Sequence, residues 1–114
     1  MIEFSFLASF AKSVKRLRKK YRSLEGDIDH LLEELQANPY LGTDLGDNVR
    51  KIRLGIASKG KGKRGGARVL TDTEAVVSVE EGRITLLALY DKSERETLTE
   101  AEIKDLVQLS RYYK

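Results

Sequence analysis

Residues 49–71 read VRKIRLGIASKGKGKRGGARVLT, and this stretch predicts the centre of a β-sheet. Over 49–57 apolar residues alternate with basic ones, which is the period of a strand with one buried side and one cationic side. The segment 58–66, called the basic loop below, is rich in Gly and Lys and has no apolar residue. We expect it to be a mobile, exposed hairpin loop that returns as a second strand over 67–71.

The same stretch carries much of a strong charge asymmetry. The 114-residue chain has 21 Lys and Arg against 18 Asp and Glu, a formal net charge of +3. Fifteen of the basic residues lie in two runs, within 12–22 and 50–68, and no acid occurs between Asp47 and Asp72. The second run is therefore not neutralised by its own sequence, and its field is expected to attract polyanions.

The segments before this hairpin predict a strand and two helices. Residues 1–6 alternate apolar and polar side chains, as a half-buried strand does. From Leu7 to Tyr21 apolar residues recur at steps of three and four, which places the first basic run on the opposite face of a helix. Ser23 is a candidate cap for a second helix, which ends before Pro39.

The segments after it predict two strands and a last helix. Residues 75–79 and 83–90 predict two strands that pair as a hairpin around an acidic turn with Gly, and 99–102 (TEAE) is a capping box. The predicted fold class is α+β, in one domain spanning 1–114, with the order β-α-α-β-β-β-β-α. The sheet is expected to be antiparallel-dominated, with an N-terminal two-helix hairpin and a C-terminal helix.

Composition excludes several classes of protein. The chain has no Cys, so disulfide scaffolds, thiol nucleophiles and cysteine zinc sites are excluded, and a cytoplasmic protein is expected. No signal peptide and no window approaching ~18 apolar residues is present, so no membrane contact is expected.

Two local motifs carry little chemistry. Residues 60–65 match GxGxxG literally, but a dinucleotide site needs a helix immediately after the glycines, and here a strand is expected. The basic loop is then either solvated or tracks phosphates. The single histidine, His30, lies off the apolar stripe of its helix and has no second His nearby, so it is expected to be exposed, with no metal site and no cofactor.

The strongest signal is three cations on neighbouring strands. Lys51, Arg53 and Arg68 are expected to face one way and form a fixed positive surface. The run in the first helix is either a solvated face or a second contact with a phosphate backbone.

Three segments in order resemble the RelE/HigB superfamily of bacterial toxin–antitoxin ribonucleases, the HigB branch most closely. They are VRKIRL at 49–54, GKRGGARV at 62–69 and LLALYDKSE at 86–94. The resemblance implies a RelE-like, microbial-ribonuclease-type fold. It also implies cleavage of mRNA in the ribosomal A site and inhibition by a cognate antitoxin, often a helix-turn-helix protein that alone contacts the operator DNA.

The resemblance assigns the site residue by residue. The basic pair on the family's central strand matches Lys51 and Arg53, its phosphate-binding arginine matches Arg68, and the lysine after its last strand matches Lys92, beside Tyr90. The further RNA-binding cations would be Arg50, Lys59, Lys61, Lys63 and Arg64.

These residues suit RNA cleavage without a metal. Lysines crowded by other cations have lowered pKa values, so Lys51 or Lys92 can act as base or acid, while Arg53 and Arg68 clamp the phosphate. Tyr90 can stack on a base or donate a proton.

Two segments depart from the family pattern: 71–74 replaces an aromatic pair, and 93–98 lacks a tyrosine. The alternatives are a non-catalytic or degenerate RNA- or DNA-binding module of the same fold, and a protein-interaction domain with an acidic partner.

Overall fold

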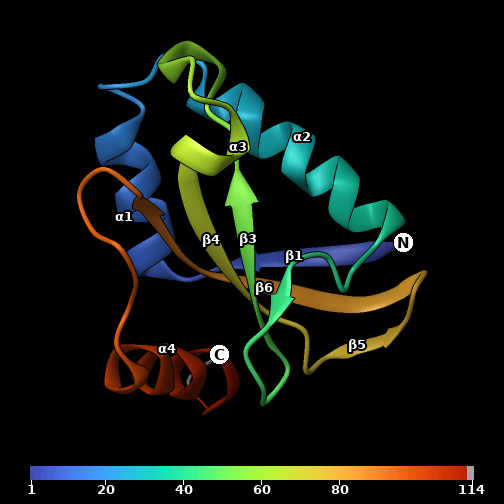
Figure 1. Cartoon of the computed structure of the whole chain (residues 1–114). Coiled ribbons are helices and arrows are strands. Elements are labelled where there is room, and N and C mark those ends of the chain that lie inside the picture. Colours follow the sequence, from blue (N-terminus) through green and yellow to red (C-terminus); the bar gives the residue numbers. More distant parts are fainter. Residues whose placement is uncertain (113–114) are drawn as a thin grey trace.

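The computed structural model describes residues 1–112, and it is an α+β fold. The predicted elements are present in the predicted order, with three short additions between them, β2, η1 and α3 (Figure 1). The elements are β1 (Ile2–Phe6), α1 (Ala8–Leu17), α2 (Leu24–Ala37), β2 (Thr43–Asp44), β3 (Val49–Leu54), the 3₁₀ helix η1 (Ala57–Lys59), α3 (Gly62–Gly65), β4 (Ala67–Asp72), β5 (Val76–Ser78), β6 (Glu81–Asp91) and α4 (Glu100–Tyr112).

One mixed six-stranded sheet organises the molecule. Its order is β1-β6-β4-β3-β2, with β5 pairing to β6 as well. β1 and β6 are parallel, and every other pair is antiparallel, so the prediction of an antiparallel-dominated sheet is confirmed. Figure 1 shows α1 and α2 grouped together and α4 at the opposite end of the view.

Each face of the sheet has its own apolar core. On one face, α1 and α2 contribute Phe10, Leu17 and Leu31, which pack against buried side chains of β3, β4 and β6. On the other face, Val107 of α4 packs with Leu70 of β4 and with three further buried residues, Val49, Leu87 and Ala88. The alternation along β3 explains the division, because Ile52 and Leu54 belong to the first core and Val49 to the second.

α4 is held at both ends. The capping box forms as predicted: the Thr99 amide donates to Glu102 Oε1 at 2.9 Å, and the Glu102 amide donates to Thr99 Oγ1 at 3.1 Å. At the other end, Ser110 Oγ donates to Asp72 Oδ2 at 2.7 Å and Arg111 Nε donates to the same oxygen at 3.2 Å. The departure at 71–74 thus includes the anchor of the last helix.

The basic loop joins β3 and β4 as a hairpin, as predicted, but it is not irregular throughout. β3 ends at Leu54, three residues before the predicted end, and η1 and α3 fold the loop back over the sheet. Gly66 permits this closure, because a Cβ there would lie 2.1 Å from the carbonyl oxygen of Leu54.

Ser23 occupies the predicted N-cap position of α2, but its side chain does not cap the helix. Its hydroxyl makes no capping bond; it donates to Asp27 Oδ2 at 2.7 Å and accepts from the Ser58 amide at 2.8 Å. The start of α2 is therefore tied to η1. Within residues 1–112 no helix is long and apolar enough to cross a membrane.

Candidate functional site

Four residues on three adjacent strands form the candidate site, called the cation row below: Lys51, Arg53, Arg68 and Tyr90. Arg53 of β3 lies directly opposite Arg68 of β4, and Arg68 lies directly opposite Tyr90 of β6. Directly opposite residues of antiparallel strands point to the same face, and Lys51 shares it because it is two residues from Arg53. The expectation that the three cations face one way is confirmed by this register.

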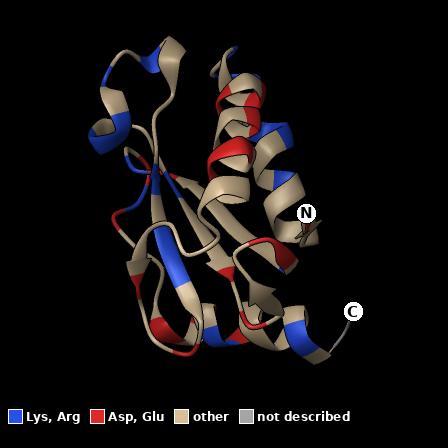
Figure 2. Cartoon of the chain, turned by 90° about the vertical axis from the view of Figure 1, so that its right-hand side faces the viewer, with Lys and Arg blue, Asp and Glu red and all other residues tan. Residues whose placement is uncertain are grey.

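α4 packs on the neighbouring part of this sheet face. Its Val107 covers Leu70 and Ala88, which pair directly in the next row of the sheet. Arg53 is exposed and Lys51 is half-buried. Neither side chain forms an ion pair with any residue in 1–112, so both charges are available to an anion. Figure 2 shows Lys and Arg segments, in blue, along one strand of the sheet.

Arg68 is placed differently from the free cation that was predicted. It is 5% exposed, and its guanidinium donates to the carbonyl oxygens of Lys63, Ala67 and Arg64 at 3.2, 3.0 and 3.0 Å. Three of the five N–H groups of an arginine are thus used, and two remain. Arg68 therefore holds the backbone of α3 by hydrogen bonds, and its positive charge lies next to that of Arg53.

Tyr90 borders a pocket of about 430 Å³ between α1, β6 and α4. Its ring is buried, and its hydroxyl has no hydrogen-bond partner within the described part of the chain. A buried hydroxyl without a partner is uncommon, because losing water without a replacement costs free energy. The hydroxyl oxygen is itself closed off from solvent, as is that of Thr71, so Tyr90 offers a bound molecule no exposed hydroxyl in this structure.

Arg95 borders the same pocket, and it is the residue that sequence reasoning passed over in the segment 93–98. Its guanidinium makes two bonds to Glu102, at 2.9 and 2.7 Å. These bonds, with the Thr99 amide, lower the pKa of Glu102 to about 2, so the pair is fully charged at neutral pH. The signal available in the sequence was a single arginine shortly before a capping box.

Lys92 follows β6 directly and is tied to the same region. Its backbone N–H donates to the Gly66 carbonyl at 3.2 Å, next to the start of β4. Its ammonium lies 3.4 Å from Glu96, and its side chain is 34% exposed. Lys92 is therefore partly accessible and partly neutralised.

The prediction that Lys59 is an exposed phosphate-binding cation is wrong. Its side chain is 7% exposed, and its ammonium donates to Asp91 Oδ1 at 2.8 Å and to Ser93 Oγ at 2.7 Å. Asp91 is fully buried and also accepts from Tyr21 Oη at 2.7 Å. No local sequence pattern indicates this cluster, because the ion pair joins residues that are 32 positions apart.

The environment of Asp91 keeps it charged. Burial raises the pKa of this carboxyl, but hydrogen bonds from Lys59, Tyr21 and the Ser93 amide outweigh burial and hold the pKa well below its usual range. Asp91 lies between Tyr90 and Lys92 in the chain. The cluster therefore fixes the end of β6 on one face of the sheet, and the cation row occupies the opposite face.

Arg50, predicted as a phosphate-binding cation, lies away from the cation row. Alternation along β3 places it on the side of the sheet opposite Lys51. Its Nη1 donates to the Tyr40 carbonyl at 2.8 Å, and its guanidinium lies 5.5 Å from the centre of the Tyr40 ring. Arg50 thus holds the segment before β2 against the sheet.

The remaining cations of the basic loop are exposed, as predicted: Lys61, Lys63 and Arg64. Lys63 lies 3.6 Å from Glu34 of α2, and both side chains are well exposed to water. An exposed pair of this kind contributes little stability and is easily exchanged for another anion. These three residues extend the positive charge beyond the cation row.

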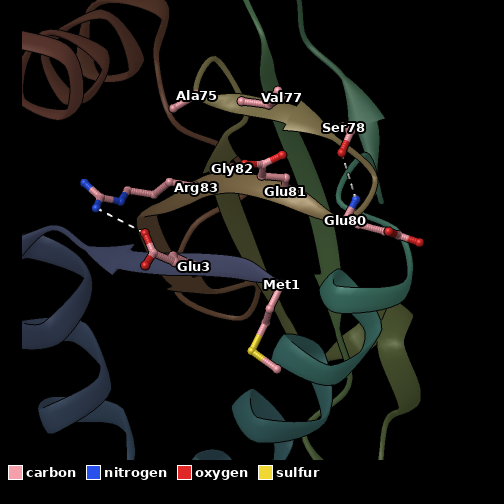
Figure 3. A pocket seen from close by; sticks show the side chains of 9 residues that line it. All are labelled: Met1, Glu3, Ala75, Val77, Ser78, Glu80, Glu81, Gly82 and Arg83. Carbon is pink, nitrogen blue, oxygen red and sulfur yellow. Dashed lines mark hydrogen bonds and ion pairs between the residues drawn. The ribbon is translucent and has the colours of Figure 1, made fainter.

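A pocket of about 690 Å³ at the far end of the sheet does not suit phosphate (Figure 3). It is bordered by Glu3, Glu80 and Glu81, and its one lining cation, Arg83, lies 3.4 Å from Glu3. His30 is exposed, as predicted, and no group of three metal-ligating side chains occurs among residues 1–112.

A scan of the chain against known protein families finds no match.

Proposed function

We propose that this chain is a metal-independent endoribonuclease that cleaves mRNA on the ribosome, and the toxin of a toxin–antitoxin pair resembling the RelE/HigB superfamily. One observation carries the proposal: Arg53, Arg68 and Tyr90 lie directly opposite one another on one face of the sheet, with Lys51 two residues from Arg53 on the same face. The order of elements, with two helices between β1 and the rest of the sheet, supports a RelE-like fold.

The row supplies what the reaction needs. The 2′-hydroxyl loses its proton to a base, its oxygen attacks the adjacent phosphorus, and the bond from phosphorus to the 5′ oxygen breaks as that oxygen takes a proton from an acid. Lys51 and Lys92 are the candidates for the two proton transfers. Arg53 faces the solvent and is placed to bind the phosphate oxygens as their negative charge grows.

Three further residues complete the site. Arg68 adds a fixed positive charge beside Arg53, and two of its N–H groups have no partner among residues 1–112. Tyr90 and Arg95 border the pocket next to the row, where a base of the message would lie against the Arg95 guanidinium. The ribosome would position the message, which reduces the chemical work left to the protein.

The partners follow from the same proposal. The toxin would act in the cytoplasm on mRNA in the A site. A cognate antitoxin, of the helix-turn-helix type, would hold it inactive and would alone contact operator DNA.

A second candidate function is a non-catalytic RNA-binding module. It is favoured by the engagement of Arg68 with three carbonyl oxygens and by the burial of the Tyr90 hydroxyl, since both residues are turned away from solvent. Such a module would use Arg53 and the exposed cations of the basic loop to bind the phosphate backbone without cleaving it.

Primer extension on mRNA translated with purified ribosomes tests the proposal. The chain is expected to cut the message, and Arg53→Gln is expected to slow cutting by about 10²- to 10³-fold, the usual cost of one lost anion-stabilising group. Arg83→Gln is the matched control: it removes one exposed arginine at the other end of the sheet and should leave the rate unchanged.

Cutting that persists in Arg53→Gln would refute the assignment of the site. Binding of RNA with no cutting by the natural chain would favour the second candidate. Expression in bacteria gives a parallel readout, because growth arrest that Arg53→Gln relieves is expected only of the enzyme.

A further inference from the structure

The basic run at 12–22, which begins in α1 and continues beyond its end at Leu17, contains a second cationic surface, separate from the cation row. Three of its seven cations pair with acids: Arg16 with Glu94 at 2.8 Å, Arg18 with Glu25 at 3.5 Å, and Lys20 with Asp91 at 3.4 Å. The other four have no acidic partner within residues 1–112 and are exposed. They are Lys12, Lys15, Lys19 and Arg22, called the α1 stripe below.

The spacing of the stripe places its lysines along the outer edge of the helix. A helix turns about 100° per residue, so Lys12 and Lys15 lie opposite Phe10 and Leu17, which are buried in the core. Lys19 follows four residues after Lys15, in the turn that continues from α1. Residues three and four apart are neighbours on a helix, at about 5–6 Å between Cβ atoms.

The stripe concentrates like charge on the free protein. Lys12 and Lys15 are three residues apart in α1, so their charges repel one another. The acids of the neighbouring helix α2 leave these four cations unpaired, although both helices pack on the same face of the sheet (Figure 2). A bound polyanion would relieve this repulsion.

We propose that the α1 stripe binds the phosphate backbone of double-stranded RNA, and so docks the toxin on folded RNA of the ribosome. The identity of the polyanion as RNA rests on the proposed function. The stripe holds no aromatic side chain on which unpaired bases would stack, which disfavours single-stranded RNA. The apolar face of α1 lies in the core and is not free to enter a membrane.

The stripe lies beside the candidate site and does not overlap it. Ser9, Ser13 and Arg16 of α1 border the pocket that Tyr90 also borders, and the stripe occupies the next side of the same helix. RNA held on the stripe would therefore leave the cation row free for a message. The stripe is a docking surface and takes no part in the chemistry.

Fluorescence anisotropy with a labelled RNA duplex of about 16 base pairs, without ribosomes, tests the inference. Lys15→Gln/Lys19→Gln is compared with Arg83→Gln/Lys104→Gln, a pair that removes the same two positive charges elsewhere on the surface. If each lysine neutralises one phosphate, the α1 pair weakens binding by about 30-fold near 0.15 M salt, and the slope of log K against log salt falls by about two.

The control pair is expected to change the affinity by less than about 3-fold, since it touches no phosphate. Equal losses in both pairs would overturn the inference, because net charge alone would then explain binding. Loss of binding to a poly-glutamate peptide, with RNA binding unchanged, would assign the stripe to an acidic protein and would also overturn it.

Failure of this inference is distinguishable from failure of the proposed function. A chain that binds the duplex through the stripe but does not cut mRNA would refute the enzyme and support the docking surface. A chain that cuts mRNA, but binds the duplex equally well with and without Lys15 and Lys19, would refute the docking surface alone.

Discussion

Replacing Asp91 by Asn tests the buried cluster that fixes the end of β6. The change keeps the size of the side chain and removes its negative charge. Lys59, whose side chain is 7% exposed, then keeps its positive charge with no counter-ion in contact. The hydroxyl of Tyr21 and the amide of Ser93 also lose a charged acceptor, at 2.7 and 2.9 Å in the natural chain.

The expected loss in the free energy of unfolding is large, although the substitution only replaces a carboxylate oxygen by an amide group. Breaking a buried ion pair by removing one partner costs about 3–5 kcal/mol, because the other charge stays buried. A domain of this length has a free energy of unfolding of about 6–17 kcal/mol. Asp91→Asn is therefore expected to remove a substantial fraction of the total stability while leaving a folded protein.

Urea unfolding followed by circular dichroism measures this loss. With an m-value near 2 kcal/mol/M, the midpoint is expected to fall by about 2 M. Glu94→Gln is the matched control, because it makes the same chemical change in an exposed pair with Arg16, and it should cost less than about 1 kcal/mol.

A double variant tests the physical reason. Adding Lys59→Met to Asp91→Asn removes the stranded charge and fills its space, so at least half of the lost stability should return. A loss below about 1 kcal/mol in Asp91→Asn, or purely additive losses in the double variant, would refute the account of Asp91 as a buried counter-ion.

Acid should act on the same carboxylate. The pKa of Asp91 is lower in the folded chain than in the unfolded one, so its contribution to stability is present above about pH 4, the ordinary aspartate pKa, and is lost as pH falls below it. Urea unfolding at a series of pH values should therefore show a smaller loss between about pH 5 and pH 2 in Asp91→Asn than in the natural chain. Equal losses would contradict the lowered pKa.

Three further outcomes are expected. Gly66→Ala should destabilise the chain by about 3 kcal/mol in urea unfolding, because the new Cβ would lie 2.1 Å from the Leu54 carbonyl oxygen. Gly26→Ala should stabilise the chain by about 0.5–1 kcal/mol, because this α2 position has open space around it. In an NMR titration the carboxyl of Glu102 should have its midpoint near pH 2, and Arg95→Gln should raise it toward the ordinary value; an unchanged midpoint would contradict the bidentate pair. Arg111→Gln should cost about 3 kcal/mol and speed hydrogen exchange in α4, because Asp72 is 4% exposed and would lose its cation.

Local patterns determined the secondary structure well. The alternation in 1–6, the acidic turn with Gly at 80–82, the three-and-four spacing before Tyr21 and the capping box at 99–102 each depend on neighbours along the chain. Each predicted element is present. The basic loop was less predictable. Its composition indicates a solvated segment, but its folding back depends on Lys59 reaching Asp91 and on Gly66 passing close to Leu54.

The sequence by itself determined which residues lie on the cationic side of β3, because a strand alternates its side chains whatever its surroundings. It also determined that the second basic run is not neutralised from within, since no acid lies between Asp47 and Asp72. Only the tertiary structure decided which cations remain free. Arg53 keeps its charge open to solvent, whereas Lys59 and Arg50 are engaged by groups that are distant in sequence or on the opposite face of the sheet. The physical reason is that a charge is neutralised by what folding brings within a few ångströms of it, and the composition of its own segment does not contain that information.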